Sequence, residues 1–328
     1  MTFSDAEGVT GGGSSARDAM AAVRDEIGKV IVGQQGVVTG ILTAMLVEGH
    51  VLLEGVPGVA KTLTVSTLAH ALDLDTRRVQ FTPDLMPSDL TGQLVLEPGK
   101  ADFVFRHGPV FTNLLLADEL NRTPPKTQAA LLESMQERQV STGGATRPLP
   151  DPFIVIATQN PIEHEGTYPL PEAQLDRFLF LLLVDYPSQA DEIDIMRRHH
   201  DGVDMRDPAA AGVSRAAGPA DLAAARAEIQ RIGVDDRILT YIVDLARATR
   251  SDGAVELGVS PRGASMLLHA AKAWTWMSGR SFVSPDEVQA MARPALRHRV
   301  RLRADVVLDG STPDDVLGDI LSAVPVPR

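Results

Sequence analysis

The sequence contains no cysteine. Disulfides and thiolate metal sites are therefore excluded, which is compatible with a reducing compartment. No apolar run approaches the roughly 18 residues that a membrane-spanning helix needs. Residues 1–18 also lack the basic segment and the apolar segment of a secretory signal. We therefore expect a cytoplasmic protein without a membrane span, in which residues 1–15 form a flexible tail.

Positive charge is also scarce, because 31 Lys and Arg residues face 43 Asp and Glu residues and the net charge is −12 at pH 7. Proteins that bind nucleic acid without regard to its sequence use Lys and Arg to neutralise phosphates, so this balance argues against that class. Two short basic runs, at 197–200 and 297–303, are local exceptions. We interpret each as a solvated helix end or a face against a neighbouring subunit, with a local nucleic-acid contact as the alternative.

A glycine-rich stretch follows a short apolar run at 51–53. The sequence GVPGVAKT fits the phosphate-binding pattern GxxxxGK[ST], with Ala60 where the second glycine is expected. In such a loop the backbone N–H groups surround a triphosphate, the lysine reaches its β and γ phosphates, and the hydroxyl holds Mg²⁺. The stretch therefore predicts a site for ATP and Mg²⁺. The alternative is an ordinary Gly/Pro turn with a solvated Lys61.

The predicted nucleotide contacts come from this loop and from the first turn of the helix that begins at Lys61. The partial positive charge of that helix terminus points at the bound anion. Thr62 is in addition a predicted metal ligand. The residues of this set are Gly55, Val56, Pro57, Gly58, Val59, Ala60, Lys61, Thr62 and Leu63.

Two adjacent carboxylates follow a second apolar run. Residues 114–117 read as a buried strand that leads directly to Asp118 and Glu119. Acids at such a position are costly to bury unless they hold a metal or a proton. This is a Walker B pattern, in which Asp118 orients the Mg²⁺ shell and Glu119 polarises the attacking water. The alternative is an acidic strand end followed by a turn.

A polar amide follows the next buried strand, which we expect over 153–158. Asn160 would then lie at the carboxyl end of a strand beside the Walker B strand. Open α/β sheets bind their ligands at that edge, so Asn160 is a candidate for contact with the γ phosphate or the water. Taken alone, an asparagine before a proline is simply a turn residue.

The alternation of strands and helices over residues 16–186 predicts a parallel sheet covered by helices. Two hairpins are expected within it, one over 93–105 and one over 138–149. Beyond Tyr186 the pattern reads as helical, so we expect a small all-α lid domain at 187–328. Arg262 lies in the first turn of a lid helix, where the helix dipole disfavours a cation. It therefore suggests an anionic partner, with a solvated side chain as the alternative.

Several motifs together resemble the MoxR-type AAA+ ATPases, in a likeness that covers essentially all of the chain after the tail. GVPGVAKT is the usual form of the P-loop in that family, so Ala60 is no departure from it. The motifs are GVPGVAKT, QFTPDLMPSDLTG, LLLADELNRTPPKTQAALLESMQER, IATQNP, LPEAQLDRF and VSPRG.

The resemblance implies an AAA+ core that assembles as a ring, commonly a hexamer, with ATP between subunits. It implies that Asn160 is sensor 1, that Arg177 is an arginine finger offered to the neighbour's nucleotide, and that Arg262 is sensor 2. Gly33 and Gln34 would lie near the adenine. The two hairpins would be the helix-2 insert and the pre-sensor-1 hairpin. Whether Arg262 acts on its own subunit's ATP or on the next one's stays open.

The implied function is that of an ATP-hydrolysing remodelling factor or chaperone. Such proteins work with a partner that carries a von Willebrand factor A domain, in maturation or metal insertion of a client complex. The alternatives are a magnesium-chelatase-type motor subunit, a nucleic-acid-dependent motor, and a scaffold that binds ATP with negligible turnover. The sequence has no aromatic-hydrophobic-Gly pore loop and no GAFTGA segment, which lowers the unfoldase and enhancer-binding interpretations.

Overall fold

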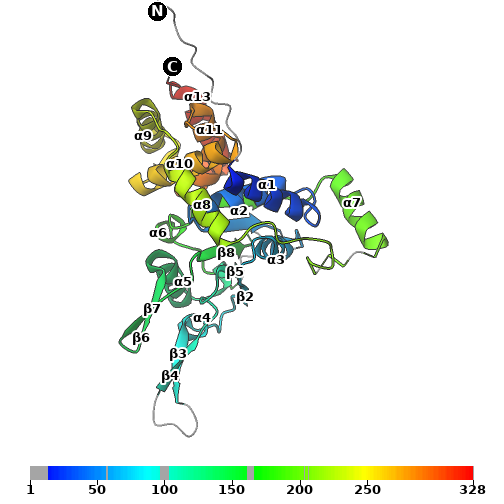
Figure 1. Ribbon diagram of the computed structural model, residues 1–328. Helices are drawn as coiled ribbons and strands as arrows, with labels where there is room; N and C mark the ends of the chain where they lie inside the picture. Colours follow the sequence, from blue (N-terminus) through cyan, green and yellow to red (C-terminus); the bar gives the residue numbers. More distant parts are fainter. Residues whose placement is uncertain are drawn as a thin grey trace, which may run out of the picture.

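The computed structural model describes residues 14–56, 58–96, 103–160, 166–202, 204–205 and 207–327. At its centre lies a five-stranded sheet in which every neighbouring pair of strands is parallel. This confirms the predicted α/β fold with a parallel sheet (Figure 1). In spatial order the strands are β2 (Thr76–Gln80), β5 (Leu114–Asp118), β8 (Ile154–Gln159), β1 (Val51–Gly55) and β9 (Phe180–Val184).

The inner strands β1, β5 and β8 are largely buried on both faces because both faces of the sheet are covered there. Alternate residues of β1 point to opposite sides, so Val51 and Leu53 belong to one buried cluster and Leu52 to another. The larger cluster includes the helices α1, α2 and α3, and the smaller one includes α5. The helices of this part are α1 (Ser15–Gly28), α2 (Gln35–Leu46), α3 (Lys61–Ala71), α4 (Pro87–Thr91), η1 (Leu120–Arg122), α5 (Pro125–Glu137), α6 (Glu172–Leu175) and α7 (Gln189–His200).

Both predicted hairpins are present and project from the core (Figure 1). The strands β3 (Gly92–Leu96) and β4 (Phe103–His107) form the first, and β6 (Gln139–Thr142) and β7 (Ala145–Pro148) form the second. Residues 97–102, within the hairpin predicted over 93–105, lie outside the described residues. The N-terminal tail does so as well up to residue 13, and α1 begins at Ser15.

The C-terminal part is helical, as expected for the lid, apart from one short pair of strands. A short antiparallel pair joins β10 (Val255–Leu257) to β11 (Arg301–Leu302). Ser260 and Ser284 cap their helices, through contacts with the Gly263 N–H and with Glu287. The helices here are α8 (Pro219–Gln230), α9 (Asp236–Ser251), α10 (Pro261–Met277), α11 (Pro285–Leu296), η2 (Arg297–Arg299), α12 (Ala304–Leu308) and α13 (Pro313–Ala323).

The basic run at 297–303 is solvated only in part, because Arg301 and Arg303 are exposed but Arg299 is buried, contrary to the expectation of a solvated helix end. The side chain of Arg299 is only 1% exposed, and its Nε lies 2.6 Å from Asp176 Oδ1. Its other nitrogens donate to backbone carbonyls, including those of Phe178 and Leu179. Arg297 pairs with Asp314 at 2.8 Å. The run therefore anchors the C-terminal part to the segment that precedes β9.

The run at 197–200 does end a helix, since it forms the last turn of α7.

The boundary between the core and the C-terminal part is crossed by helix contacts. Both α8 and α10 contact α2 as well as each other. The domain limits 1–15, 16–186 and 187–328 consequently stay predictions. Within the described residues no helix is long and apolar enough to cross a membrane.

Candidate functional site

The P-loop connects the carboxyl end of β1 to the first residue of α3. Gly58 has a φ of 87° and Ala60 a φ of 57°, so the chain turns through two left-handed residues before Lys61 opens the helix. Such a turn aims successive N–H groups into one concave loop. Gly55 is required for a different reason, because a Cβ there would lie 2.3 Å from the carbonyl oxygen of Val184 on β9. Pro57 lies outside the described residues.

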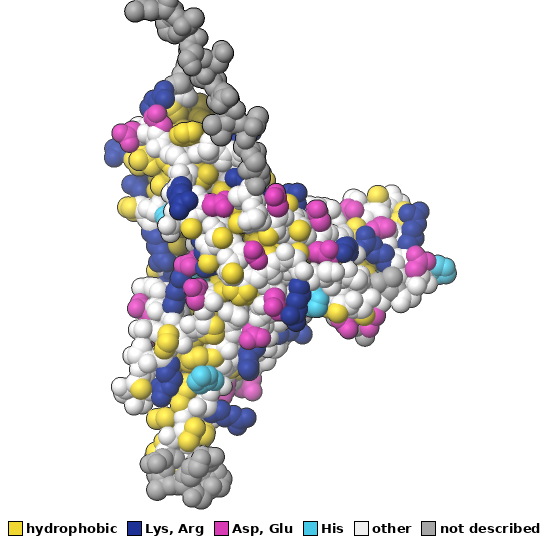
Figure 2. Space-filling view, in the orientation of Figure 1, with side chains coloured by type: hydrophobic (Ala, Val, Ile, Leu, Met, Phe, Trp, Pro, Cys, Tyr) yellow, Lys and Arg dark blue, Asp and Glu magenta, His cyan; other side chains and the backbone are white. Residues whose placement is uncertain are grey.

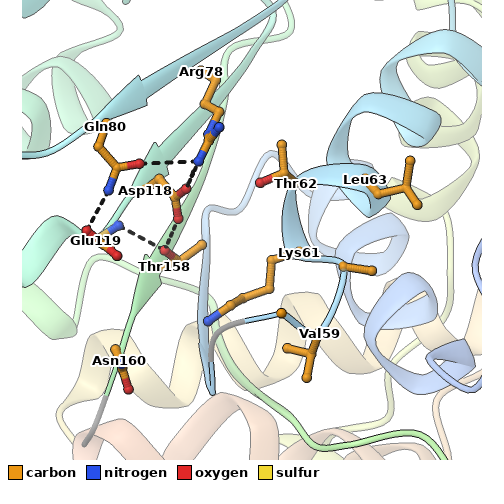
Figure 3. Close-up of a pocket in the computed structure, with 12 residues that line it drawn as sticks. Val59, Lys61, Thr62, Leu63, Arg78, Gln80, Asp118, Glu119, Thr158 and Asn160 are labelled. Atoms are coloured by element: carbon orange, nitrogen blue, oxygen red, sulfur yellow. Dashed lines mark hydrogen bonds and ion pairs between the residues drawn. The ribbon is translucent and has the colours of Figure 1, made fainter. Parts of the chain in front are cut away.

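A cavity of about 440 Å³ lies at the carboxyl edge of the sheet, where β1, β5 and β8 end (Figure 3). It brings together the residues predicted from three separate motifs. The P-loop contributes its lysine and threonine, the Walker B strand its two carboxylates, and β8 its asparagine. The lining residues are Gly58, Val59, Ala60, Lys61, Thr62, Leu63, Arg78, Gln80, Asp118, Glu119, Thr158 and Asn160.

The Lys61 ammonium group folds back onto its own loop. Its Nζ donates to the carbonyl oxygen of Gly55 at 2.6 Å. Partial burial lowers the pKa of Lys61 from its usual value, although the nearby acids Asp118, Glu119 and Glu54 act in the opposite direction. The ammonium group is thus partly desolvated and close to the position of the predicted phosphates. An anion in the cavity would restore the interactions that burial removes.

The Walker B carboxylates are fixed from β8 and from β2. Asp118 Oδ1 accepts a hydrogen bond from the Thr158 hydroxyl at 2.6 Å, and the same hydroxyl oxygen accepts from the Glu119 N–H at 2.9 Å. Asp118 Oδ2 lies 2.6 Å from Nη2 of Arg78. Glu119 has a left-handed φ of 57°. Its Oε2 accepts from Gln80 Nε2 at 2.5 Å and from Arg122 at 2.9 Å.

Sequence reasoning missed Arg78, Gln80 and Thr158 as site residues. Arg78 and Gln80 are two positions apart on β2, a strand that we did not predict, and they therefore share one face of it. Two polar residues spaced by two could have indicated one face of a strand. The strand is largely exposed and polar, however, so it lacks the apolar pattern by which strands are predicted. Thr158 precedes Asn160 by two residues on β8 and so lines the same cavity.

Gly33 and Gln34, predicted near the adenine, line a second cavity of about 440 Å³. Its other walls come from the end of β9 and from Pro294 and Arg297 of the C-terminal part. Within its wall, Gln34 Nε2 donates a hydrogen bond to the carbonyl oxygen of Asp185 at 2.9 Å, which joins the start of α2 to the residue after β9. No residue is common to the linings of this cavity and the P-loop cavity as the described part of the chain forms them. Val56 packs against the larger core cluster.

Arg177 and Arg262 lie at the opposite edge of the sheet from the P-loop. Arg177 comes three residues before Phe180, the first residue of β9, whereas the P-loop follows the last residue of β1. The five residues of β1 separate these edges by about 16 Å. Both arginines line a cavity of about 300 Å³ together with His50, which directly precedes β1. Arg177 Nη1 donates to the carbonyl oxygen of Leu132 at 2.8 Å.

The comparisons with known proteins agree with this fold. Residues 50–180 match the ATPase family associated with various cellular activities (AAA), and residues 247–320 match an AAA lid domain. A crystal structure of a proposed ATPase from Cytophaga hutchinsonii is 40% identical and superimposes with a TM-score of 0.87, over 95% of this chain and 96% of the other. The fold and the site therefore define an ATPase of the AAA class.

A relative of known family narrows the class, and a second relative is similar over the same length. The chain is 43% identical to the chaperone MoxR1 of Mycobacterium tuberculosis over 312 residues, which are 92% of this chain and 81% of that protein. It is 44% identical to the uncharacterized protein YeaC of Bacillus subtilis over 305 residues, which are 92% of this chain and 93% of that protein. The chain belongs to the MoxR family of AAA+ ATPases, as its motifs predict.

Proposed function

We propose that this chain hydrolyses ATP with Mg²⁺ and uses the energy to remodel a client protein as a chaperone. One observation carries the enzymatic part. Lys61, Thr62, both Walker B carboxylates and Asn160, from three separate elements, line one cavity at the carboxyl edge of a parallel sheet. A turn with a solvated lysine would not require the other four residues at the same place. The chaperone part draws on the MoxR1 relative.

Mg²⁺ suits the oxygen atoms of this cavity. The described residues contain no group of three or more His, Cys, Asp or Glu residues that could hold a metal by itself. Mg²⁺ does not need one, because it is usually bound by one or two protein oxygens together with substrate phosphates and water. Thr62 and Asp118 would hold it, and it would neutralise charge on the phosphates. The hydroxyl of Thr158 orients the Asp118 carboxylate for this role.

The remaining residues of the cavity divide the work of hydrolysis. The N–H groups of the P-loop and the Lys61 ammonium group bind the phosphates. Glu119, held at the strand end by its left-handed backbone, polarises the attacking water. Asn160 contacts the γ phosphate or that water from β8. Gly33 and Gln34 would contact the adenine, and the cavity that they line at the end of β9 offers a place for it.

We propose further that the active site is completed by a neighbouring copy in a ring, commonly a hexamer. Arg177 and Arg262 share one cavity at the edge of the sheet where the strands begin, about 16 Å from the P-loop edge. Neither side chain can span that distance to its own nucleotide. This supports Arg177 as an arginine finger acting on the neighbour. For the same reason we propose that Arg262 also acts on the nucleotide of the neighbouring subunit.

The partner and the client follow the family expectation. We propose a partner with a von Willebrand factor A domain and a role in maturation or metal insertion of a client complex. Apolar side chains of the β3–β4 hairpin are exposed at the lower end of the molecule and support a contact there (Figure 2). They are Leu94, Leu96, Phe103 and Val104. Affinity capture from a native extract, with ATP and with ADP, should recover a protein of that domain class, and its repeated absence would contradict this part.

Two substitutions test the enzymatic part. Lys61→Ala should abolish ATP binding, because the phosphates lose their charged contact. Glu119→Gln should bind ATP like the wild type but release phosphate at least about 100-fold more slowly, as expected when a general base is removed. Equilibrium binding and steady-state phosphate release measure the two effects. Tight ATP binding by Lys61→Ala would contradict the P-loop role, and negligible wild-type turnover would favour a nucleotide-gated scaffold.

A further inference from the structure

The carboxylate of Asp118 already has a positively charged partner. On β2, Arg78 approaches Asp118 Oδ2 with Nη2 at 2.6 Å and with Nε at 3.2 Å (Figure 3). The other carboxylate oxygen, Oδ1, accepts the hydroxyl of Thr158 at 2.6 Å. Both carboxylate oxygens of the predicted metal ligand Asp118 therefore have a hydrogen-bond donor, and the donor at Oδ2 is a guanidinium group.

The Arg78 guanidinium group contacts two residues of the cavity wall. Besides Asp118 it donates to Gln80 Oε1 at 3.3 Å. Its side chain is 53% exposed, whereas that of Asp118 is 15% exposed. An exposed arginine of this kind can leave its partner for water at small cost.

A guanidinium group on Asp118 Oδ2 repels a divalent cation that approaches the same carboxylate. We propose that Arg78 is a resident cation that competes with Mg²⁺ for Asp118, and that it thereby sets how strongly ATP binding depends on the metal. Without Mg²⁺, Arg78 keeps positive charge beside the phosphate site. When Mg²⁺ binds with the nucleotide, Arg78 leaves Oδ2 and loses part of that benefit. This inference depends on the proposed ATP site.

The neighbouring Arg77 provides a matched control. It lies on the same strand and is exposed as well, but successive side chains of a strand point to opposite faces. In the sheet Arg77 is paired with Leu115 and Arg78 with Leu116. Arg78 lines the P-loop cavity and Arg77 does not. Arg77→Gln and Arg78→Gln therefore make the same change of composition and net charge on the two faces of one strand.

The test measures the affinity of a fluorescent, slowly hydrolysed ATP analogue with Mg²⁺ and with EDTA. The dissociation constant in EDTA divided by the dissociation constant in Mg²⁺ reports how strongly binding depends on the metal. We expect Arg78→Gln to raise this ratio about three- to fivefold over the wild type, as suits the loss of one half-exposed ion pair. Arg77→Gln should leave the ratio unchanged, and Arg78→Lys, which keeps the charge but not the fork of donors, should lie between.

A second readout follows the metal directly. Titration of the protein and the analogue with Mn²⁺, detected by electron paramagnetic resonance, should give tighter Mn²⁺ binding to Arg78→Gln than to the wild type. Thermal unfolding of each variant shows whether it is folded. If Arg78→Gln is unfolded, Arg78→Lys is compared with the wild type instead. Equal weakening with and without metal, or an unchanged ratio in a folded variant, would overturn this inference alone. Failure of the wild type to bind the analogue at all would instead overturn the proposed ATP site.

Discussion

At the scale of single residues, Gly55 shows how backbone contact constrains the phosphate loop. A Cβ at this position would lie 2.3 Å from the carbonyl oxygen of Val184, so β1 and β9 would have to move apart. We expect Gly55→Ala to lower the free energy of unfolding by about 1–3 kcal/mol, as overpacking does, and to weaken ATP binding. Denaturant unfolding and nucleotide titration measure the two effects.

The control for that substitution is Gly28→Ala. A Cβ on Gly28, the last residue of α1, would meet no heavy atom within 4 Å. This change should alter the free energy of unfolding by less than about 1 kcal/mol and leave ATP binding unchanged. If Gly55→Ala proved as harmless as Gly28→Ala, the close approach of the two strands would not be what requires a glycine.

His50 is a buried residue whose chemistry is set by its two hydrogen bonds. Nδ1 accepts from the Val155 N–H at 3.0 Å, so the proton of the neutral ring resides on Nε2, which lies 3.2 Å from the carbonyl oxygen of Met135. Burial lowers the pKa of His50 from 6.5 to about 4, the Met135 carbonyl opposes this, and the charges of Arg138 and Arg262 add to it. The folded protein therefore keeps the ring neutral at mildly acidic pH.

This shift predicts a loss of stability as the pH falls. Between pH 6.5 and about pH 4 the unfolded chain binds a proton that the folded chain does not, so stability is full above this window and decreases through it. At pH 5 the loss from His50 should be about 2 kcal/mol. Unfolding by denaturant at several pH values should show a shallower pH dependence for His50→Gln. Equal slopes in the two proteins would show that His50 does not titrate in this way.

At the scale of elements, η2 joins the C-terminal part to the strand that follows Arg177. Arg299 of η2 is buried and pairs with Asp176, which also accepts from the Ser260 hydroxyl at the start of α10. A buried ion pair that loses one partner leaves an uncompensated charge. We expect Arg299→Ala to lower the free energy of unfolding by about 3–5 kcal/mol, measured by denaturant titration.

The exposed Arg303 is the control in the same basic run. Its Nε lies 3.6 Å from Asp305, and both side chains are largely exposed. Arg303→Ala should change stability by less than about 1 kcal/mol. A double-mutant cycle between Arg299 and Asp176 should give a coupling energy well above that. Additive effects of the two substitutions would mean that the pair contributes little beyond packing.

The elements that the sequence predicted well are those whose pattern is local. The apolar runs of β1, β5 and β8 are buried on both faces, and the Ser-Pro starts of α10 and α11 are helix caps, so neighbouring residues suffice to define them. The edge strand β2 was missed because only Val79 of its five residues is buried. Its existence depends on pairing with β5, a contact that sequence periodicity does not contain.

The candidate site shows the same division. Its P-loop and Walker B residues follow directly from two motifs, whereas Arg78 and Gln80 enter the cavity only through the missed strand. Arg299 was misjudged because a run of alternating arginines resembles a solvated surface. Its burial results from Asp176, which lies 123 residues earlier in the chain. Residues that act through distant partners are therefore the ones that local patterns fail to identify.

At the scale of the whole molecule, the parallel sheet separates the two halves of the predicted active site. The strands β1, β5 and β8 end at the P-loop cavity, whereas Arg177 and Arg262 line a cavity beside the starts of β1 and β9. A copy that turns its Arg177 edge toward the P-loop edge of the next can complete that site, and repetition of this contact closes a ring. Hydrolysis should therefore depend on assembly. The specific activity of the wild type should fall on dilution in parallel with the loss of oligomer, measured by phosphate release and light scattering.

Mixing two inactive variants tests this arrangement and decides the direction in which each arginine acts. Arg177→Ala should bind ATP but not hydrolyse it, and Glu119→Gln should do the same. In a random one-to-one mixture, about a quarter of the interfaces join an intact Glu119 to an intact Arg177 of the neighbour, so phosphate release should recover to about that share of the wild-type rate. Arg262→Ala mixed with Glu119→Gln should recover as well, because Arg262 shares a cavity with Arg177. If only the Arg177→Ala mixture recovered, Arg262 would act on the nucleotide of its own subunit; if neither did, the site would not be shared between copies.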